Sequence, residues 1–258
     1  MKEILEGLAS DGRIRLVLDG PMATIWLEHP RRRNAMSARM MLDLAEVVSQ
    51  LESWEGSVLV VRGAERQFCA GADLRLMDGV FSTPEGALWM SDWMSGLLNR
   101  IFSAPYLSFS LVEGAAMGGG AELACSTDFR IQRRGARFQF VQASRGVSPG
   151  WGGAGRLREL VGRQGALRLL GTGEPLAPEW GLALGVVDWV LEEDASEADL
   201  MAILEPFLAK GPSALRANKR AVLSERSWSS GVSERDCFAS TVAEGHFAAV
   251  QTKKGPQP

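Results

Sequence analysis

Buried-strand patterns alternate with helical patterns along most of this chain, and two of the strands run into loops of small residues. SVLVVRGA (57–64) leads to CAGAD (69–73), and LSFSLVEG (107–114) leads to MGGGAE (117–122). Continuous apolar runs of this length are typical of strands covered on both faces, as in sheets whose strands are connected by helices. The sequence therefore predicts an α/β fold with loops gathered at the strand ends.

The remaining patterns extend this alternation. Gly20 and Pro21 form a turn signal between two short strands, and Ser37 is an N-cap candidate for a helix that stops at Gly56. We expect further strands at 128–132, 137–141 and 186–191, and helices at 86–103, 197–210, 213–226 and 232–249. The amphipathic helices of the tail must bury their apolar faces, either on the core or on a neighbouring subunit.

Length and composition restrict the class of protein. A chain of 258 residues with 46% apolar content suffices for one large domain, or for a core with a smaller helical part. The net charge of −3 and the lack of a basic stripe give no reason to expect nucleic acid. We read neither a signal peptide nor a membrane span, and three scattered cysteines suit free thiols, so we expect a cytoplasmic protein.

The two small-residue loops share one chemical possibility. In each, a strand ends and a helix begins, so free backbone N–H groups are expected at the helix start. Two such loops side by side would hold one oxygen between their N–H groups, which is the arrangement of an oxyanion hole. Glu122, at the head of the second helix, is a candidate acid or base. The alternative is that the glycines only permit close packing of helix against strand.

Other functional motifs fit less well. The chain contains neither GxGxxG nor GxxxxGK[ST], so dinucleotide-binding and P-loop functions lack their motif. GVSPG (146–150) matches the GxSxG pattern of α/β-hydrolases, with His246 downstream. However, the residue after that serine should donate its N–H to the oxyanion, and Pro149 has none. We interpret His29 and His246 as structural or surface residues, and Asp73 as an N-cap.

Several separated motifs, in their order along the chain, resemble the crotonase superfamily, the enoyl-CoA hydratase/isomerase family. They are FCAGADLRLM, EGAAMGGGAELACSTDFRI, GVSPGWGGAGRLRELVG and GLALGVVDWVL. The resemblance implies a crotonase-like spiral of ββα units over residues 1–195 and a C-terminal helical trimerisation region over 196–258. It also implies a homotrimer or a dimer of trimers, an acyl-CoA thioester substrate, no metal, and no cofactor beyond the CoA moiety.

The resemblance assigns catalytic positions. Ala72 and Gly119 match the residues whose backbone N–H groups form the oxyanion hole, and Glu122 matches the first of the two glutamates that a hydratase uses. The position of the second glutamate falls on Gln142, and residues 132–158 contain no Asp or Glu. Hydration needs a second carboxylate, so the neutral amide disfavours it.

The resemblance also assigns binding positions. Ala70 and Ala72 match the loop that accepts the adenine, while Arg33, with Ala35 close behind it, fits the basic contact to the CoA phosphates. A solvated surface is the alternative interpretation of the arginines. Trp151 is expected to be a wall of the substrate pocket, with plain core packing as its alternative.

These assignments favour a lyase that works through a thioester enolate, most simply a decarboxylase of a short 2-alkylmalonyl-CoA. Loss of CO2 generates the enolate without a base. Gln142 would then hydrogen-bond the departing carboxylate, and Glu122, if burial keeps it protonated, would protonate the carbanion. Gln142 as a satisfied core residue is the structural alternative. The functional alternatives are an enoyl-CoA hydratase or isomerase with Glu122 as its only carboxylate, and a silent oligomeric acyl-CoA-binding or scaffold protein.

Overall fold

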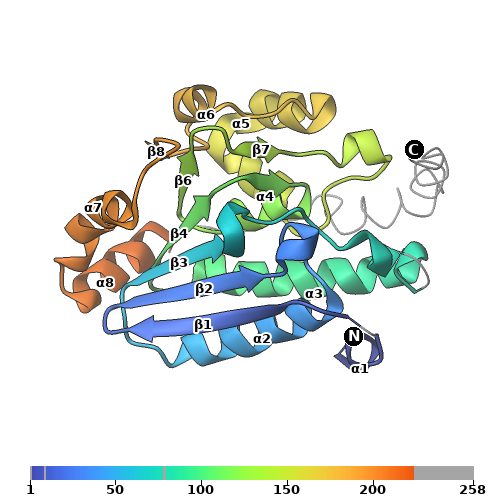
Figure 1. The fold of residues 1–258 in the computed structure, drawn as a ribbon, viewed down its shortest axis with the longest axis horizontal. Coiled ribbons are helices and arrows are strands. Elements are labelled where there is room, and N and C mark those ends of the chain that lie inside the picture. The colour runs from blue at the N-terminus through green and yellow to red at the C-terminus, as the bar shows by residue number, and fades with distance from the viewer. Residues whose placement is uncertain (1, 9, 78–79, 224–258) are drawn as a thin grey trace.

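The computed structural model describes residues 2–8, 10–77 and 80–223 and has a central six-stranded sheet with helices around it (Figure 1). The strand order is β1-β2-β3-β4-β6-β8; β1 and β2 are antiparallel, and every later pair is parallel. The six strands are β1 (Arg13–Asp19), β2 (Met22–Glu28), β3 (Val58–Gly63), β4 (Leu107–Val112), β6 (Phe129–Arg133) and β8 (Trp189–Leu191). The predicted α/β architecture is therefore confirmed.

The helices predicted at 86–103, 197–210 and 213–226 begin within two residues of these positions. The helices of the structure are α1 (Lys2–Glu6), α2 (Ala38–Glu52), α3 (Pro84–Ser103), α4 (Gly119–Ala124), α5 (Gly153–Thr172), α6 (Pro178–Leu184), α7 (Glu197–Leu208) and α8 (Pro212–Leu223). Ser37 caps α2 as expected, because its hydroxyl accepts the Met40 N–H at 3.2 Å. The helix expected at 232–249, together with Cys237 and His246, lies outside the described residues.

A strand–strand–helix unit repeats along the chain, as the resemblance implies. After β4 come β5 (Ala115–Met117) and α4, and after β6 come β7 (Arg137–Gln139) and α5. The short strands β5 and β7 pair with each other in a second layer. Residues 69–73, after β3, join this layer through the bridge between Cys69 and Ala116. The ends of successive repeats are thereby brought side by side.

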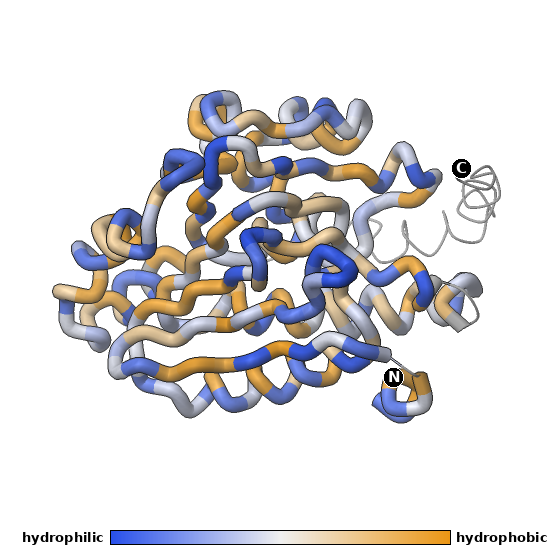
Figure 2. The backbone as a smooth tube through the Cα atoms, in the orientation of Figure 1, coloured by the Kyte–Doolittle hydropathy of each residue, from blue (hydrophilic) through white to orange (hydrophobic). Residues whose placement is uncertain are grey.

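Two apolar clusters lie on opposite faces of the central strands. Alternate residues of β3 point to different clusters: Leu59 and Val61 belong to the larger one, with α2, α3 and α4, whereas Val58 and Val60 belong to the smaller one. Because both faces are covered, these strands read as continuous apolar runs (Figure 2). No helix in the described part of the chain is both long and apolar enough to cross a membrane.

Helix α7 covers the second face of the sheet. Leu200 and Leu204 are buried in the smaller cluster, and the ring of Phe207 packs edge-on against Phe109 of β4 at 5.2 Å. The first helix of the predicted tail therefore packs on the core of its own chain.

Helix α8 is tied to the core by a buried charge pair. Lys219, whose side chain is 3% exposed, donates to Asp128 at 2.6 Å and to the carbonyl of Tyr106 at 2.8 Å. Asp128 also accepts the N–H and the hydroxyl of Ser108, in strand β4. Burial lowers the pKa of Lys219, although the adjacent Asp128 opposes this shift. Removing one partner of such a pair lowers the free energy of unfolding, because the remaining charge is left without its counter-ion.

Lys219→Ala should lower the free energy of unfolding by about 3 kcal/mol, because it leaves the Asp128 carboxylate without its cation. Urea unfolding followed by circular dichroism measures this loss. The control is Arg100→Ala, which removes the ion pair of an exposed arginine with Glu52 and should cost under about 1 kcal/mol. Equal losses in the two variants would show that Lys219 does not anchor α8.

Candidate active site

The first small-residue loop lies between two other segments of the second layer. On one side, Ala70 N–H donates to the carbonyl of Arg33 at 3.0 Å, and Met36 forms a bridge with Ala72. On the other side, Cys69 exchanges two backbone hydrogen bonds with β5. The segment 69–73 is therefore held on both edges.

Met36 fixes the orientation of the peptide that contains the Ala72 N–H. The Met36 N–H donates to the Gly71 carbonyl at 2.7 Å, and the Asp73 N–H donates to the Met36 carbonyl at 2.9 Å. In a planar trans peptide the carbonyl and the following N–H point in opposite directions. The Ala72 N–H consequently points away from Met36, toward the edge of the segment that pairs with β5. It donates to no backbone carbonyl within the described ranges.

The N–H of Gly119, at the start of α4, is left without a backbone acceptor among the described residues for a similar reason. The Gly118 carbonyl accepts the Glu122 N–H at 3.0 Å, so it points along the helix. The N–H of Gly119, in the same peptide unit, points away from the helix start.

The two loops approach backbone to backbone. A Cβ on Gly71, which has φ +94°, would lie 3.3 Å from the Gly119 nitrogen, and a Cβ on Gly120 would lie 2.0 Å from the Cys69 carbonyl oxygen. Side chains at these positions would force the loops apart. The structure therefore brings the loops of Ala72 and Gly119 together.

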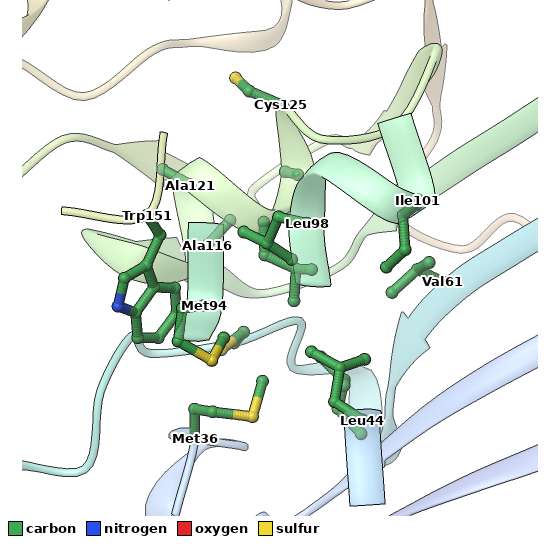
Figure 3. Close-up of a cluster of buried hydrophobic side chains, with 14 of the residues drawn as sticks. Met36, Leu44, Val61, Met94, Leu98, Ile101, Ala116, Ala121, Cys125 and Trp151 are labelled. Atoms are coloured by element: carbon green, nitrogen blue, oxygen red, sulfur yellow. The ribbon is translucent and has the colours of Figure 1, made fainter. Parts of the chain in front are cut away.

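Trp151 covers the start of α4. Its indole lies so close that a Cβ on Gly119 would be 2.5 Å from the Trp151 Cζ3 atom. The side chain is 3% exposed and belongs to the buried cluster that includes Met36 and Met94 (Figure 3). Trp151 thus packs in the core and also lies beside Gly119, so the two expectations for this residue are not exclusive.

Glu122 is buried and surrounded by hydrogen-bond donors. Its carboxylate accepts the backbone N–H groups of Gly150 at 3.4 Å, Trp151 at 2.7 Å and Gly153 at 3.1 Å, and the side-chain amide of Gln142 at 2.9 Å. An ionised carboxylate only accepts, so these four donors favour the charged form. Burial at 2% exposure favours the protonated form, so the two effects on Glu122 oppose each other.

Gln142 lies where the resemblance puts a second glutamate. The residue is 8% exposed, and its amide nitrogen faces Glu122. Its side-chain oxygen has no hydrogen-bond partner among the described residues. The predicted proximity of positions 122 and 142 is therefore present, with an amide in place of a carboxyl group.

The residues expected to bind CoA come from two adjacent segments. Arg33 is exposed, and its carbonyl accepts the Ala70 N–H. This bond places residues 29–34, which we call the arginine loop, beside the first small-residue loop. Ala35 is buried at 7% exposure. The structure brings Arg33, Ala70 and Ala72 into one layer and places Ala35 beneath its surface.

Sequence reasoning missed two residues that organise this layer. Asn34 has φ +54°, and its amide donates to the carbonyls of Ala64 at 2.9 Å and Gln67 at 2.7 Å. Asparagine tolerates left-handed backbone, so an asparagine in the polar segment after a strand was a usable signal. Met36 orients the Ala72 peptide through its backbone groups, so its side-chain type carries no such signal.

Comparison with known proteins assigns the family. The enoyl-CoA hydratase/isomerase family model matches residues 19–257. Ethylmalonyl-CoA decarboxylase of Danio rerio is 40% identical over 202 residues, which cover 76% of this chain and 67% of that protein. The human protein of the same name is 37% identical over 81% of this chain and 69% of its own length.

Solved structures agree with this assignment. Enoyl-CoA hydratase from Thermoplasma volcanium GSS1 superposes with a TM-score of 0.76 at 30% identity, covering 93% of both chains. A putative enoyl-CoA hydratase from Thermobifida fusca YX, in complex with acetoacetyl-CoA, gives a TM-score of 0.73 at 26% identity, covering 93% of this chain and 95% of that one. The chain therefore belongs to the enoyl-CoA hydratase/isomerase family and is an enzyme of the crotonase superfamily.

Proposed function

We propose that this acyl-CoA-processing enzyme decarboxylates a short 2-alkylmalonyl-CoA. The observation that carries the proposal is the neutral partner of Glu122: where hydration needs a second carboxylate, the structure has the amide of Gln142. The relatives named ethylmalonyl-CoA decarboxylase support the same reaction class. In this reaction the bond between the α-carbon and the carboxylate carbon breaks, and CO2 leaves. The electron pair of that bond stays on the thioester and forms an enolate. The α-carbon then takes up one proton.

The enolate oxygen would be stabilised by the N–H groups of Ala72 and Gly119. Both N–H groups lack a backbone acceptor within the described residues, and they belong to loops that touch each other. Donors held in place before the reaction stabilise a developing oxyanion without reorganisation, and each is worth about 3 kcal/mol of barrier. Trp151, buried against Gly119, would exclude water from this oxygen.

Glu122 would supply the proton. Its donors favour the carboxylate in the free enzyme, but a bound malonyl thioester adds a second negative charge nearby. Two neighbouring carboxylates bind one proton more readily than a single one. Glu122 would therefore take up a proton as the substrate binds and pass it to the α-carbon after CO2 leaves. The second amide hydrogen of Gln142 would orient the departing carboxylate.

The remaining parts of the proposal concern the rest of the substrate and the assembly. Arg33 would contact the CoA phosphates, and the loop of Ala70 and Ala72, with Ala35 beneath it, would accept the adenine. The CoA moiety is the only cofactor chemistry that this reaction requires. We also propose a homotrimer or a dimer of trimers in the cytoplasm, for which light scattering of the purified protein is the measurement.

Incubation of the purified enzyme with ethylmalonyl-CoA should release CO2 and yield butyryl-CoA. Gas detection measures the CO2, and mass spectrometry identifies the thioester product. Methylmalonyl-CoA and crotonyl-CoA serve as the comparison substrates. Rapid hydration of crotonyl-CoA without any decarboxylation would overturn the proposal in favour of a hydratase. Inertness toward all three thioesters, with measurable binding, would favour a scaffold protein.

Glu122→Gln should lower kcat for decarboxylation by at least about 100-fold, because the amide cannot carry the proton. Steady-state kinetics measures this loss, and a binding titration with butyryl-CoA checks that the pocket remains intact. Glu46→Gln, at an exposed position of α2, is the matched control. Unchanged turnover in Glu122→Gln would remove Glu122 from the mechanism.

Gln142→Glu should lower kcat/KM for ethylmalonyl-CoA by about 10-fold or more, because a carboxyl group beside Glu122 repels the substrate carboxylate. The same variant should hydrate crotonyl-CoA faster than the wild type, since it restores the pair of carboxyl groups. Mass spectrometry of the thioester measures the decarboxylation rate, and the absorbance of the enoyl thioester measures the hydration rate. Gln50→Glu adds the same charge at an exposed site and should change neither rate.

A further inference from the structure

Four charged or titratable side chains form a cluster next to the Ala72 peptide. They are Asp11, His29, Asp73 and Arg75. Arg75 Nη2 donates to Asp11 Oδ1 at 2.7 Å and to Asp73 Oδ2 at 2.6 Å. His29 Nε2 lies 3.2 Å from Asp11 Oδ1, and His29 Nδ1 lies 2.9 Å from the Ala35 carbonyl oxygen. The cluster therefore joins the chain before β1, the arginine loop and the first small-residue loop.

The positive charge of this cluster comes from Arg75. Ligand atoms of Asp11, His29 and Asp73 lie within 4.8 Å of one another, a spacing compatible with a metal ion. One guanidinium nitrogen of Arg75, however, already bridges both carboxylates, and Arg75 Nε donates to Asp73 as well. We therefore interpret the cluster as an ion-pair network.

Asp73 makes this network relevant to Ala72. Its side chain is 3% exposed, and an unpaired buried carboxylate is strongly disfavoured. Burial raises the pKa of Asp73, but the hydrogen bonds and charge of Arg75 outweigh it, with a smaller contribution from Arg32, so the pKa lies below its usual value. Arg75 is thus the main group that keeps the Asp73 carboxylate charged in its buried place.

The outer partner of Arg75 is itself fixed. The carbonyl of Asp11 accepts the hydroxyl of Ser37 at 2.5 Å, and Ser37 caps α2. Arg75, whose side chain is 48% exposed, therefore lies between Asp11, whose backbone is anchored to the start of α2, and the buried carboxylate of Asp73 next to Ala72.

We propose that Arg75 is a positioning residue for the reaction: by holding Asp73 in place, it keeps the Ala72 N–H directed at the oxyanion. The Asp73 N–H makes one of the two hydrogen bonds with Met36 that set the orientation around Ala72. Without the Arg75 guanidinium, the Asp73 carboxylate keeps only the backbone N–H of residue 75, at 3.1 Å, among the donors of this cluster, and it turns toward water to be solvated. That movement breaks the bond to Met36 and rotates the Ala72 N–H. This inference rests on the proposed function, since it assigns Ala72 its role there.

Arg75→Gln should lower kcat for ethylmalonyl-CoA at least about tenfold, with KM changed less than about threefold, because misplaced donors affect the transition state most. The double variant Asp73→Asn/Arg75→Gln should recover most of the lost kcat, since the neutral pair leaves no buried charge to be solvated. A general loss of stability would not produce this recovery. Arg134→Gln, another half-exposed ion-paired arginine on β6–β7, is the matched control and should keep wild-type kinetics.

Hydrogen exchange by mass spectrometry separates this inference from the proposed function. The peptide around residues 69–76 should exchange faster in Arg75→Gln than in the wild type and return toward wild-type rates in the double variant. Wild-type kinetics in Arg75→Gln, or exchange that is unchanged, would overturn the positioning role. If the wild type does not decarboxylate ethylmalonyl-CoA, the proposed function fails, and the exchange rates alone decide whether Arg75 holds the Ala72 peptide.

Discussion

The buried carboxylate of Glu122 is the interaction on which the rest of the site depends. A carboxyl group at 2% exposure requires hydrogen-bond partners, and the backbone of residues 150–153 supplies three donors. These bonds join α4 to the start of α5 and place Trp151 over Gly119. The close approach of this backbone to Glu122 also explains the glycine at position 153, because a Cβ there would lie 2.4 Å from the Glu122 Cγ atom. One side chain thus determines the path of the loop that closes the site.

Much of the fold follows from local patterns. The N-cap at Ser37 and the strand runs of β3 and β4 are short-range signals, because capping and burial on two faces depend on neighbouring residues. The pairing of Glu122 with position 142 came from matching motifs in order, and the 2.9 Å contact agrees with it. Boundaries were less accurate: the strand expected at 186–191 begins only at Trp189.

The network around Ala72 was not accessible to the same reasoning. Arg75 meets Asp11 across 64 positions of the chain, and no periodicity connects them. Met36 contributes through backbone groups, which every residue except proline carries alike. The three backbone N–H groups that contact the Glu122 carboxylate also lie about thirty residues away along the chain, so no local pattern predicts them. Long-range polar contacts are specified by the fold as a whole.

The contact of Gly120 with Cys69 has an evolutionary consequence. The backbones of the two loops are in direct contact there, since a Cβ on Gly120 would lie 2.0 Å from the Cys69 carbonyl oxygen. The spacing of the loops is therefore independent of the size of the surrounding side chains. Substitutions of the surrounding side chains therefore leave the spacing of the Ala72 and Gly119 loops unchanged. A side chain at position 120, in contrast, would force the two loops apart, so this position requires glycine whatever the neighbouring side chains are.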